Sequence, residues 1–295
     1  MGEDLKVNRR QRLELAVAGF ELHRTPARLK AAIKGAGFQA LADQVSHDDL
    51  KRSAQSAKEL FEAGVDVVVL GDEDFPKRLV NAKSAPAVLF FWGNPKLLHA
   101  NSVGMCGSRN VSARGLEAAR TCGLKVAETG LIIVSGYAKG VDTETHLAAL
   151  DSGGRTVIVL AEGIAGFKRK RAFDGSRFSE ETILAVSQFA PNQPWNVGAA
   201  MQRNGTIAGL SRALVVIEAG ETGGTLDAGY KALSMGRPVL ALTFETQETP
   251  AGNELLFERG AIRIANRKQL AQVLESIRET PTSEDLSGEQ LSLLR

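Results

Sequence analysis

Val103-Gly-Met-Cys-Gly-Ser-Arg-Asn110 is the stretch that indicates the fold, and a long amphipathic segment follows it as far as Gly130. Residues 103–106 suit a short buried strand in a parallel sheet. Gly107 and Ser108 are small, so the backbone can turn sharply after the strand. Residues 112–128 carry apolar side chains at helical spacing and are followed by a glycine. The stretch therefore predicts a strand, a tight turn and a helix.

The turn after this strand has the features of an anion-binding site. A helix that begins directly after a strand points its free N–H groups at whatever lies over the turn, and these groups attract negative charge. Arg109 adds a forked guanidinium whose geometry matches phosphate oxygens. The alternative is an ordinary strand-to-helix connection with an exposed arginine. A short glycine motif alone does not decide between them.

Strands and helices alternate along the chain after residue 65. Apolar strand segments are expected at 67–70, 87–92, 103–106, 131–134, 156–160, 183–189, 213–217, 238–243 and 261–264, and later helices at 202–211, 225–235 and 267–278. This alternation predicts an α/β fold: a doubly wound, mostly parallel sheet covered by helices on both faces. In such sheets a ligand binds beyond the carboxyl ends of the strands, where the strand order reverses.

Three turns that follow strands share small and cationic residues. They are Gly107-Ser-Arg109, Ser135-Gly-Tyr-Ala-Lys-Gly140, and Glu218 with Gly223-Gly-Thr225. Because the carboxyl ends of parallel strands meet at one edge of the sheet, we expect the turns to gather there. Their convergence favours a phosphate-bearing ligand more strongly than any single motif.

The chain divides into three parts. Residues 1–62 read as helices, with Thr25-Pro26 and Ser46 as helix-start signals, and predict a small N-terminal helical domain. Residues 63–280 form the expected α/β domain. Residues 281–295 are expected to be a polar C-terminal tail.

Composition excludes several classes of protein. The net charge of +2 over 295 residues gives no global attraction to nucleic acid or membrane, so a polyanion site needs a local patch. Cys106 and Cys122 lie among apolar residues and are expected to be buried, reduced thiols, and the four histidines show no metal-ligand spacing. We expect no metal and no cofactor. Without a signal peptide or a run of about 18 apolar residues, we expect a cytoplasmic protein with no membrane contact.

Several motifs carry a family resemblance. They include the three turns above, of which the second continues to Asp142. The others are Phe75-Pro-x-x-Leu79, Gly93-Asn94, His146, Gln202–Ser211, Val215–Ala219, Gly236-Arg-Pro-Val239, Gly252-Asn253 and Gly260-Ala261. With these motifs in sequence order across residues 65–265, the chain resembles the DNA processing protein A family (DprA, also called Smf). That family belongs to a wider Rossmann-like group that includes the lysine-decarboxylase-like phosphoribohydrolases.

The resemblance implies a non-enzymatic function with no catalytic residues. Members bind single-stranded DNA, form homodimers and hand the DNA to a RecA-type recombinase in recombination during natural transformation, the uptake of DNA by competent cells. By resemblance, Arg109, Lys139 and Arg203 hold backbone phosphates, and Ser108 and the N–H groups near Gly107, Gly136 and Gly224 bind phosphate oxygens. The full expected DNA- or phosphate-binding set is Gly107, Ser108, Arg109, Ser135, Gly136, Lys139, Gly140, Arg203, Asn204, Gly223, Gly224 and Thr225.

Two further features are candidates for DNA contact. Tyr137 and Trp195 are candidates for base stacking, or for simple packing, in a chain with only 5% aromatic residues. Lys168-Arg-Lys-Arg171 is a candidate basic patch, or a solvated loop.

The chain also departs from the family pattern. Gly205 stands where members usually carry the second arginine of Arg-Asn-Arg. We also expect the chain to lack the C-terminal winged-helix domain that many members have. We therefore expect a divergent member.

Two alternatives remain open at this point. The first is a nucleotide-binding sensor or a phosphoribohydrolase-like enzyme, motivated by Glu218, Asp227 and Gly223-Gly-Thr225; the glutamate that those hydrolases carry after this motif is not in place. The second is a partner-binding protein with a vestigial pocket. Asp142 and His146 invite a catalytic interpretation, but we expect a helix cap and a helix-face histidine instead.

Overall fold

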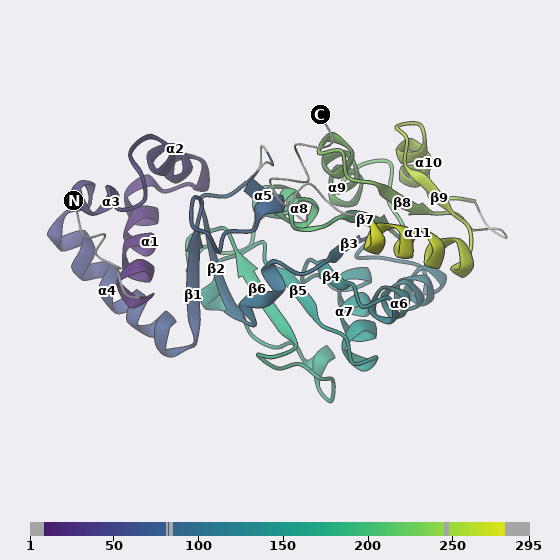
Figure 1. Cartoon of the computed structure of the whole chain (residues 1–295), viewed down its shortest axis with the longest axis horizontal. Helices are drawn as coiled ribbons and strands as arrows, with labels where there is room; N and C mark the ends of the chain where they lie inside the picture. The colour runs from purple at the N-terminus through teal and green to yellow at the C-terminus, as the bar shows by residue number, and fades with distance from the viewer. Residues whose placement is uncertain (1–8, 81, 83–84, 245–247, 281–295) are drawn as a thin grey trace.

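The computed structural model describes residues 9–80, 82, 85–244 and 248–280 (Figure 1). Its nine strands form one sheet in the order β1-β2-β6-β5-β4-β3-β7-β8-β9. The strands are β1 Val65–Val69, β2 Val88–Gly93, β3 Ser102–Cys106, β4 Ile132–Ser135, β5 Thr156–Val159, β6 Ile183–Ser187, β7 Ala213–Val216, β8 Val239–Leu242 and β9 Ile262–Ile264. The predicted α/β fold with a mostly parallel sheet is confirmed, because only the pairings β1–β2 and β2–β6 are antiparallel. The predicted tail at 281–295 lies outside the described residues.

Strand β3 lies where the strand order reverses. It pairs in parallel with β4 on one side and with β7 on the other. The chain winds from β3 through β4 and β5 to β6, and then crosses to β7 on the opposite side of β3. The connections that leave β3 and β7 therefore diverge at their carboxyl ends and open a crevice there.

Helices cover both faces of the sheet (Figure 1). They are α1 Arg9–His23, α2 Pro26–Ala36, α3 Leu41–Gln44, α4 His47–Glu62, α5 Lys77–Val80, α6 Ala113–Glu128, α7 Val141–Asp151, α8 Val197–Leu210, α9 Gly224–Ser234, α10 Ala251–Phe257 and α11 Arg267–Glu279. One apolar cluster joins α8, α9 and α10 to one face, and a second joins α6, α7 and α11 to the other. No helix in the described ranges is both long and apolar enough to cross a bilayer.

Local capping residues explain where the helices begin. The hydroxyls of Thr25, Ser46 and Ser112 accept N–H groups of the first turns of α2, α4 and α6. Helix α8 begins at Val197, five residues before the predicted start, because the Asn196 side chain caps it. The start was predicted too late because the sequence before it is polar and contains proline, which is typical of a loop. Strand β6 ends at Ser187 rather than at 189.

The N-terminal helices pack directly on the sheet. Leu13 and Phe20 of α1 belong to the same apolar cluster as Val67 of β1 and Ile158 of β5. The rings of Phe20 and Phe90 lie 5.9 Å apart. The helices thus share their core with the sheet, and the division of the chain at residue 62 remains a prediction.

Asn253 fastens the carboxyl ends of two strands. Its side chain is fully buried, and its amide nitrogen donates to the backbone carbonyls of Ile217 and Leu242, at 3.0 and 2.9 Å. Its amide oxygen accepts the Ala219 N–H at 3.0 Å. One side chain therefore satisfies three backbone groups that the ladders of β7 and β8 leave open.

We expect Asn253→Ala to lower the free energy of unfolding by about 3 kcal/mol, because it leaves three buried backbone groups without partners. Urea denaturation followed by circular dichroism measures the change. Gln272→Ala, at an exposed position of α11, is the matched control and should change the value by less than about 0.5 kcal/mol. Equal stability of the two variants would contradict the assigned role of Asn253.

Candidate functional site

A cavity of about 420 Å³ lies in the crevice beyond β3 and β7. All three predicted turns contribute to it: Gly107, Ser108 and Arg109 from the first, Ala138 from the second, and Gly224 and Thr225 from the third. The prediction that the turns meet at one edge of the sheet is confirmed. Their binding of phosphate remains a prediction.

A second hollow of about 290 Å³ adjoins the first one. Arg109, Ala138, Trp195 and Arg203 line both. The second hollow adds Lys139, Lys170 and Glu162. Together the two are lined by four cations (Arg109, Lys139, Lys170 and Arg203) and two carboxylates (Asp142 and Glu162), so their combined lining carries an excess of positive charge.

Arg109 and Trp195 form an exposed pair at the shared rim. The Arg109 guanidinium lies 5.0 Å from the centre of the Trp195 ring. Trp195 is 46% exposed, which is unusual for so large an apolar side chain. Arg109 is also exposed. A flat ring beside a stacked cation can hold a base and a phosphate side by side.

Arg203 lies beneath this rim rather than on it. Its side chain is only 8% exposed, and its Nη1 lies 4.0 Å from Oδ2 of Asp142. Burial lowers the pKa of Arg203, and the charge of Asp142 opposes that effect. The Nε atom has no hydrogen-bond partner in the described part of the chain. Arg203 was predicted as a phosphate contact; the structure gives it a carboxylate partner inside the protein while it still lines both hollows.

Two glycines of the second turn are required by close approach. A Cβ at Gly136 would lie 1.9 Å from Nη1 of Arg203 and 2.3 Å from Oδ2 of Asp142. Gly140 has a positive φ of 82°, and a Cβ there would lie 2.8 Å from the Ser108 carbonyl oxygen. These two predicted residues therefore let the second turn pack on the Arg203 side chain and on the first turn.

The prediction that Ser135 binds phosphate is wrong. It is fully buried, and its hydroxyl lies within hydrogen-bond distance of the Met105 carbonyl, at 2.7 Å, and of Oδ1 of Asp142, at 3.0 Å. It cannot touch a ligand and instead positions Asp142. Asp142 does not cap α7; Gly140 occupies the cap position, and the Asp142 carboxylate accepts the Ala138 N–H at 3.2 Å.

Tyr137 packs and does not offer a stacking face. It is 9% exposed, its ring lies 5.6 Å from both Phe167 and Phe173, and Nζ of Lys170 lies 3.9 Å from the ring centre. Its hydroxyl donates to the Lys168 carbonyl and accepts the Lys170 N–H. Of the two predicted stacking residues, Trp195 alone has the exposure that stacking requires.

The start of α6 already holds a negative group. The Glu218 carboxylate accepts the Ser112 N–H at 3.0 Å and the Ser112 hydroxyl at 2.5 Å. The Ser108 N–H donates to the Glu218 carbonyl. The expectation that this helix start faces a ligand is therefore wrong, because an internal carboxylate neutralises it. The start of α9 differs, since no side chain of a described residue caps it and Gly224 is exposed.

Asn204 holds the third turn in place. Its side-chain amide donates to the Gly224 carbonyl at 2.9 Å and to Oδ2 of Asp227 at 3.2 Å. The same Asp227 oxygen accepts a bond from Lys231 at 2.6 Å. Asn204 is mostly buried, so its predicted role in phosphate binding becomes one of positioning the exposed pair Gly223 and Gly224.

The predicted basic patch divides into two parts. Lys168, Arg169 and Arg171 are exposed. Lys170 is exposed as well, but its ammonium donates to the Tyr137 carbonyl, and partial burial lowers its pKa. Glu162 and Val197 line the hollows although the sequence did not single them out. The signal for Val197, which is 65% exposed, was an apolar pair with Trp195 in an otherwise polar stretch.

His146 is a structural residue. It is fully buried, with Nε2 2.7 Å from the Gly136 carbonyl and Nδ1 2.6 Å from the Thr156 hydroxyl. A carbonyl only accepts, so Nε2 of the neutral ring carries the proton, and the single Thr156 hydroxyl proton is shared between Nδ1 and the Ile133 carbonyl, 3.0 Å from that hydroxyl. Burial lowers the pKa of His146 to about 4, so the ring is neutral. Among the described residues no histidine, cysteine and carboxylate cluster suits a metal ion.

Comparisons with known proteins agree with this architecture. A sequence model of DNA recombination-mediator protein A matches residues 66–275. The DNA processing protein DprA of Streptococcus pneumoniae is 34% identical over 171 residues, which are 58% of this chain and 60% of that protein. The match thus spans less than two thirds of the relative's length.

Solved structures share the fold. The crystal structure of DNA processing protein A from S. pneumoniae aligns with a TM-score of 0.70 and 24% identity, over 94% of this chain and all of that one. DNA processing protein A from Helicobacter pylori, solved in work on its single-stranded DNA binding mode, aligns with a TM-score of 0.62 and 22% identity, over 71% and 96% of the two chains.

We expect the free energy of unfolding to fall by about 3 kcal/mol between pH 6.5 and pH 4 through His146. The unfolded state binds its proton near pH 6.5 and the folded state only near 4, so acid favours unfolding in this window. Urea denaturation at several pH values measures this. His146→Gln cannot take up a proton and should show a shallower pH dependence than the parent chain. Parallel profiles would contradict the assignment.

Proposed function

Because the chain belongs to the DNA recombination-mediator protein A family, we propose that it binds single-stranded DNA along the carboxyl edge of its sheet. The observation that carries the proposal is the rim formed by Arg109, Lys139 and Trp195, where exposed cations border an exposed aromatic ring. Binding that tolerates many sequences needs cations along the backbone and flat faces for the bases.

Each part of the rim has a separate role in this proposal. Arg109 and Lys139 contact successive phosphates, and Trp195 stacks on a base. Arg203 lies below and adds positive potential, which Asp142 partly neutralises. The uncapped start of α9 at Gly224 supplies N–H groups for a further phosphate oxygen. The absence of the usual family arginine at Gly205 fits a rim with fewer cations.

The carboxylates favour binding over nucleotide hydrolysis. A glycosidic hydrolysis needs a free carboxylate facing the sugar. Asp227 is engaged by Lys231 and Asn204, and Glu218 is engaged by Ser112. Asp142 accepts bonds from Ser135 and Ala138. Release of free base from nucleoside monophosphates, followed by chromatography, would support the enzymatic alternative instead.

We expect Arg109→Ala combined with Lys139→Ala to weaken binding of an oligothymidylate by about tenfold or more. The slope of log affinity against log salt should also become shallower by about 0.7 for each lost phosphate contact. Fluorescence anisotropy of a labelled oligonucleotide at several salt concentrations measures both quantities.

Lys96→Ala combined with Arg155→Ala is the matched control for this test. These two exposed cations lie at the amino edge of the parallel strands: Arg155 directly precedes β5, and Lys96 follows β2 close to Asn94, which bonds to the start of β6. Their loss removes the same charge and should leave affinity and slope nearly unchanged. Equal effects of the two double variants would mean that the rim is not the binding site.

We extend the proposal to partners by family membership. The chain forms a homodimer and delivers single-stranded DNA to a RecA-type recombinase, as part of DNA uptake or recombination. Light scattering on the purified chain should give twice the mass of 31.5 kDa. With DNA precoated by a single-strand binding protein, the chain should shorten the lag of recombinase ATP hydrolysis. A monomer with no effect on the lag would contradict this extension.

A further inference from the structure

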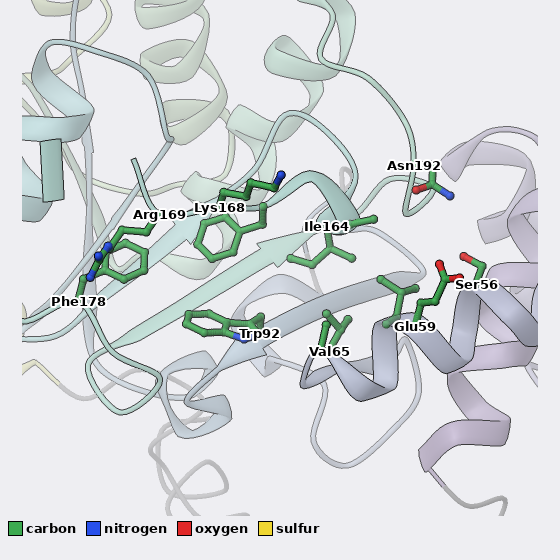
Figure 2. Close-up of a pocket in the computed structure, with 13 residues that line it drawn as sticks. Ser56, Glu59, Val65, Trp92, Ile164, Lys168, Arg169, Phe178 and Asn192 are labelled. Carbon is green, nitrogen blue, oxygen red and sulfur yellow. The ribbon is translucent and has the colours of Figure 1, made fainter. Parts of the chain in front are cut away.

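A third hollow, of about 510 Å³, lies away from the rim, between α4, the start of β1 and the segment that follows β5 (Figure 2). Trp92, Val65 and Ile164 lie along its length. Ser56, Glu59 and Asn192 lie at one end, and Phe178 and Arg169 at the other. Apart from Lys168 and Arg169 of the basic run, the residues that line this hollow belong to none of the motifs singled out in the sequence.

The hollow is walled by three aromatic rings. The ring centre of Trp92 lies 5.6 Å from that of Phe167 and 6.4 Å from that of Phe178. Phe167 and Phe178 stack on each other at 6.2 Å with an angle of 23° between their planes. All three side chains are half-buried, so part of each ring is open to the hollow. Such a wall suits a flat, apolar heterocycle.

Two cations border the aromatic part of the hollow, Arg169 at the end beside Phe178 and Lys168 nearer the middle. Lys168 and Arg169 are exposed and line the hollow (Figure 2). The Lys168 ammonium forms no ion pair or side-chain hydrogen bond with any described residue. Arg169 has an ion pair with Asp174 at 3.4 Å, and both groups are exposed, so solvent screens it strongly. Both cations are thus available to an incoming phosphate.

The opposite end offers hydrogen-bonding groups. The Glu59 carboxylate accepts a bond from the Gln55 amide at 2.8 Å and keeps further lone pairs free for an amino group. Asn192 can donate and accept, and Ser56 lies beside Glu59 (Figure 2). The two cations border the rings, and the polar groups lie at the far end. This arrangement suits a nucleotide, whose phosphate is charged and whose base has hydrogen-bonding edges.

One aromatic contact joins the lining of this hollow to that of the second hollow at the rim. Tyr137 lines the second hollow of the rim, and its ring lies 5.6 Å from Phe167, which lines the third. The three consecutive cations divide between the two sides: Lys170 lines the rim, whereas Lys168 and Arg169 line the third hollow. A backbone that leaves the rim at Lys170 meets these two cations next.

We propose that this hollow accepts one unpaired base of the same single strand, stacked on Trp92, with its phosphate on Lys168 and Arg169. The inference rests on the proposed function. It adds a second base contact on a different face of the molecule, so the strand passes from the edge of the sheet onto the face beneath the segment 161–182.

The two tryptophans of the chain allow a direct test. Trp195→Phe leaves Trp92 as the sole tryptophan. Its emission is followed while a labelled oligothymidylate of about 20 nucleotides, longer than the site of a typical single-strand binding fold, is titrated to saturation. Anisotropy of the label, measured on this variant and on the parent chain, reports binding independently. We expect the emission of Trp92 to fall by about half as binding saturates, because a stacked base quenches indole.

A second pair of variants keeps the test independent of Trp92. Lys168→Ala combined with Arg169→Ala changes exposed residues only and should weaken binding about fivefold and reduce the quenching. Lys96→Ala combined with Arg155→Ala, which removes the same charge elsewhere, should do neither. Trp92→Leu should weaken binding about tenfold.

The outcomes separate the two proposals. Saturated binding with unchanged Trp92 emission overturns this inference and leaves the proposed function standing. Equal affinities of the two double variants also overturn it. A lack of any anisotropy change with the parent chain overturns the proposed function, and this inference with it.

Discussion

The geometry of the crevice depends on the buried contact between Arg203 and Asp142. Helix α8 supplies the arginine and α7 the aspartate, so the contact joins the helices that cover opposite faces of the sheet near β3 and β4. Removing one partner of such a buried pair typically costs about 3–5 kcal/mol, because the other charge is left without compensation. The space for the pair exists only because residue 136 has no side chain.

The groups around this pair hold it in position through hydrogen bonds. Ser135 and the Ala138 N–H fix the carboxylate, and His146 holds the Gly136 carbonyl from below. Several residues that resemble a binding motif in sequence are therefore the support of the crevice. The positions exposed at the rim are fewer: Arg109, Lys139, Trp195 and the glycines at the start of α9.

The sheet, its helices and the meeting of the three turns could be predicted, because periodicity and strand-end chemistry are local properties of the chain. Burial could not. Ser135 and Ser108 look alike in sequence, but Ser135 lies at the end of a central strand beneath two packed helices, and Ser108 lies in the turn beyond one. Likewise, nothing local indicated that Glu218, about 100 residues away, occupies the start of α6. The aromatic hollow at Trp92 could not be predicted from the sequence, because its rings come from segments about 75 to 85 residues apart.

The adjacency of β3 and β7 has a consequence for how the protein is made. Val103 pairs with Ala213, about 110 residues later, so the crevice closes only through contacts of high sequence separation. During synthesis, the turn at Arg109 leaves the ribosome long before the strand that completes its surroundings. This edge of β3 stays unpaired until β7 has been made, so the crevice forms late in folding.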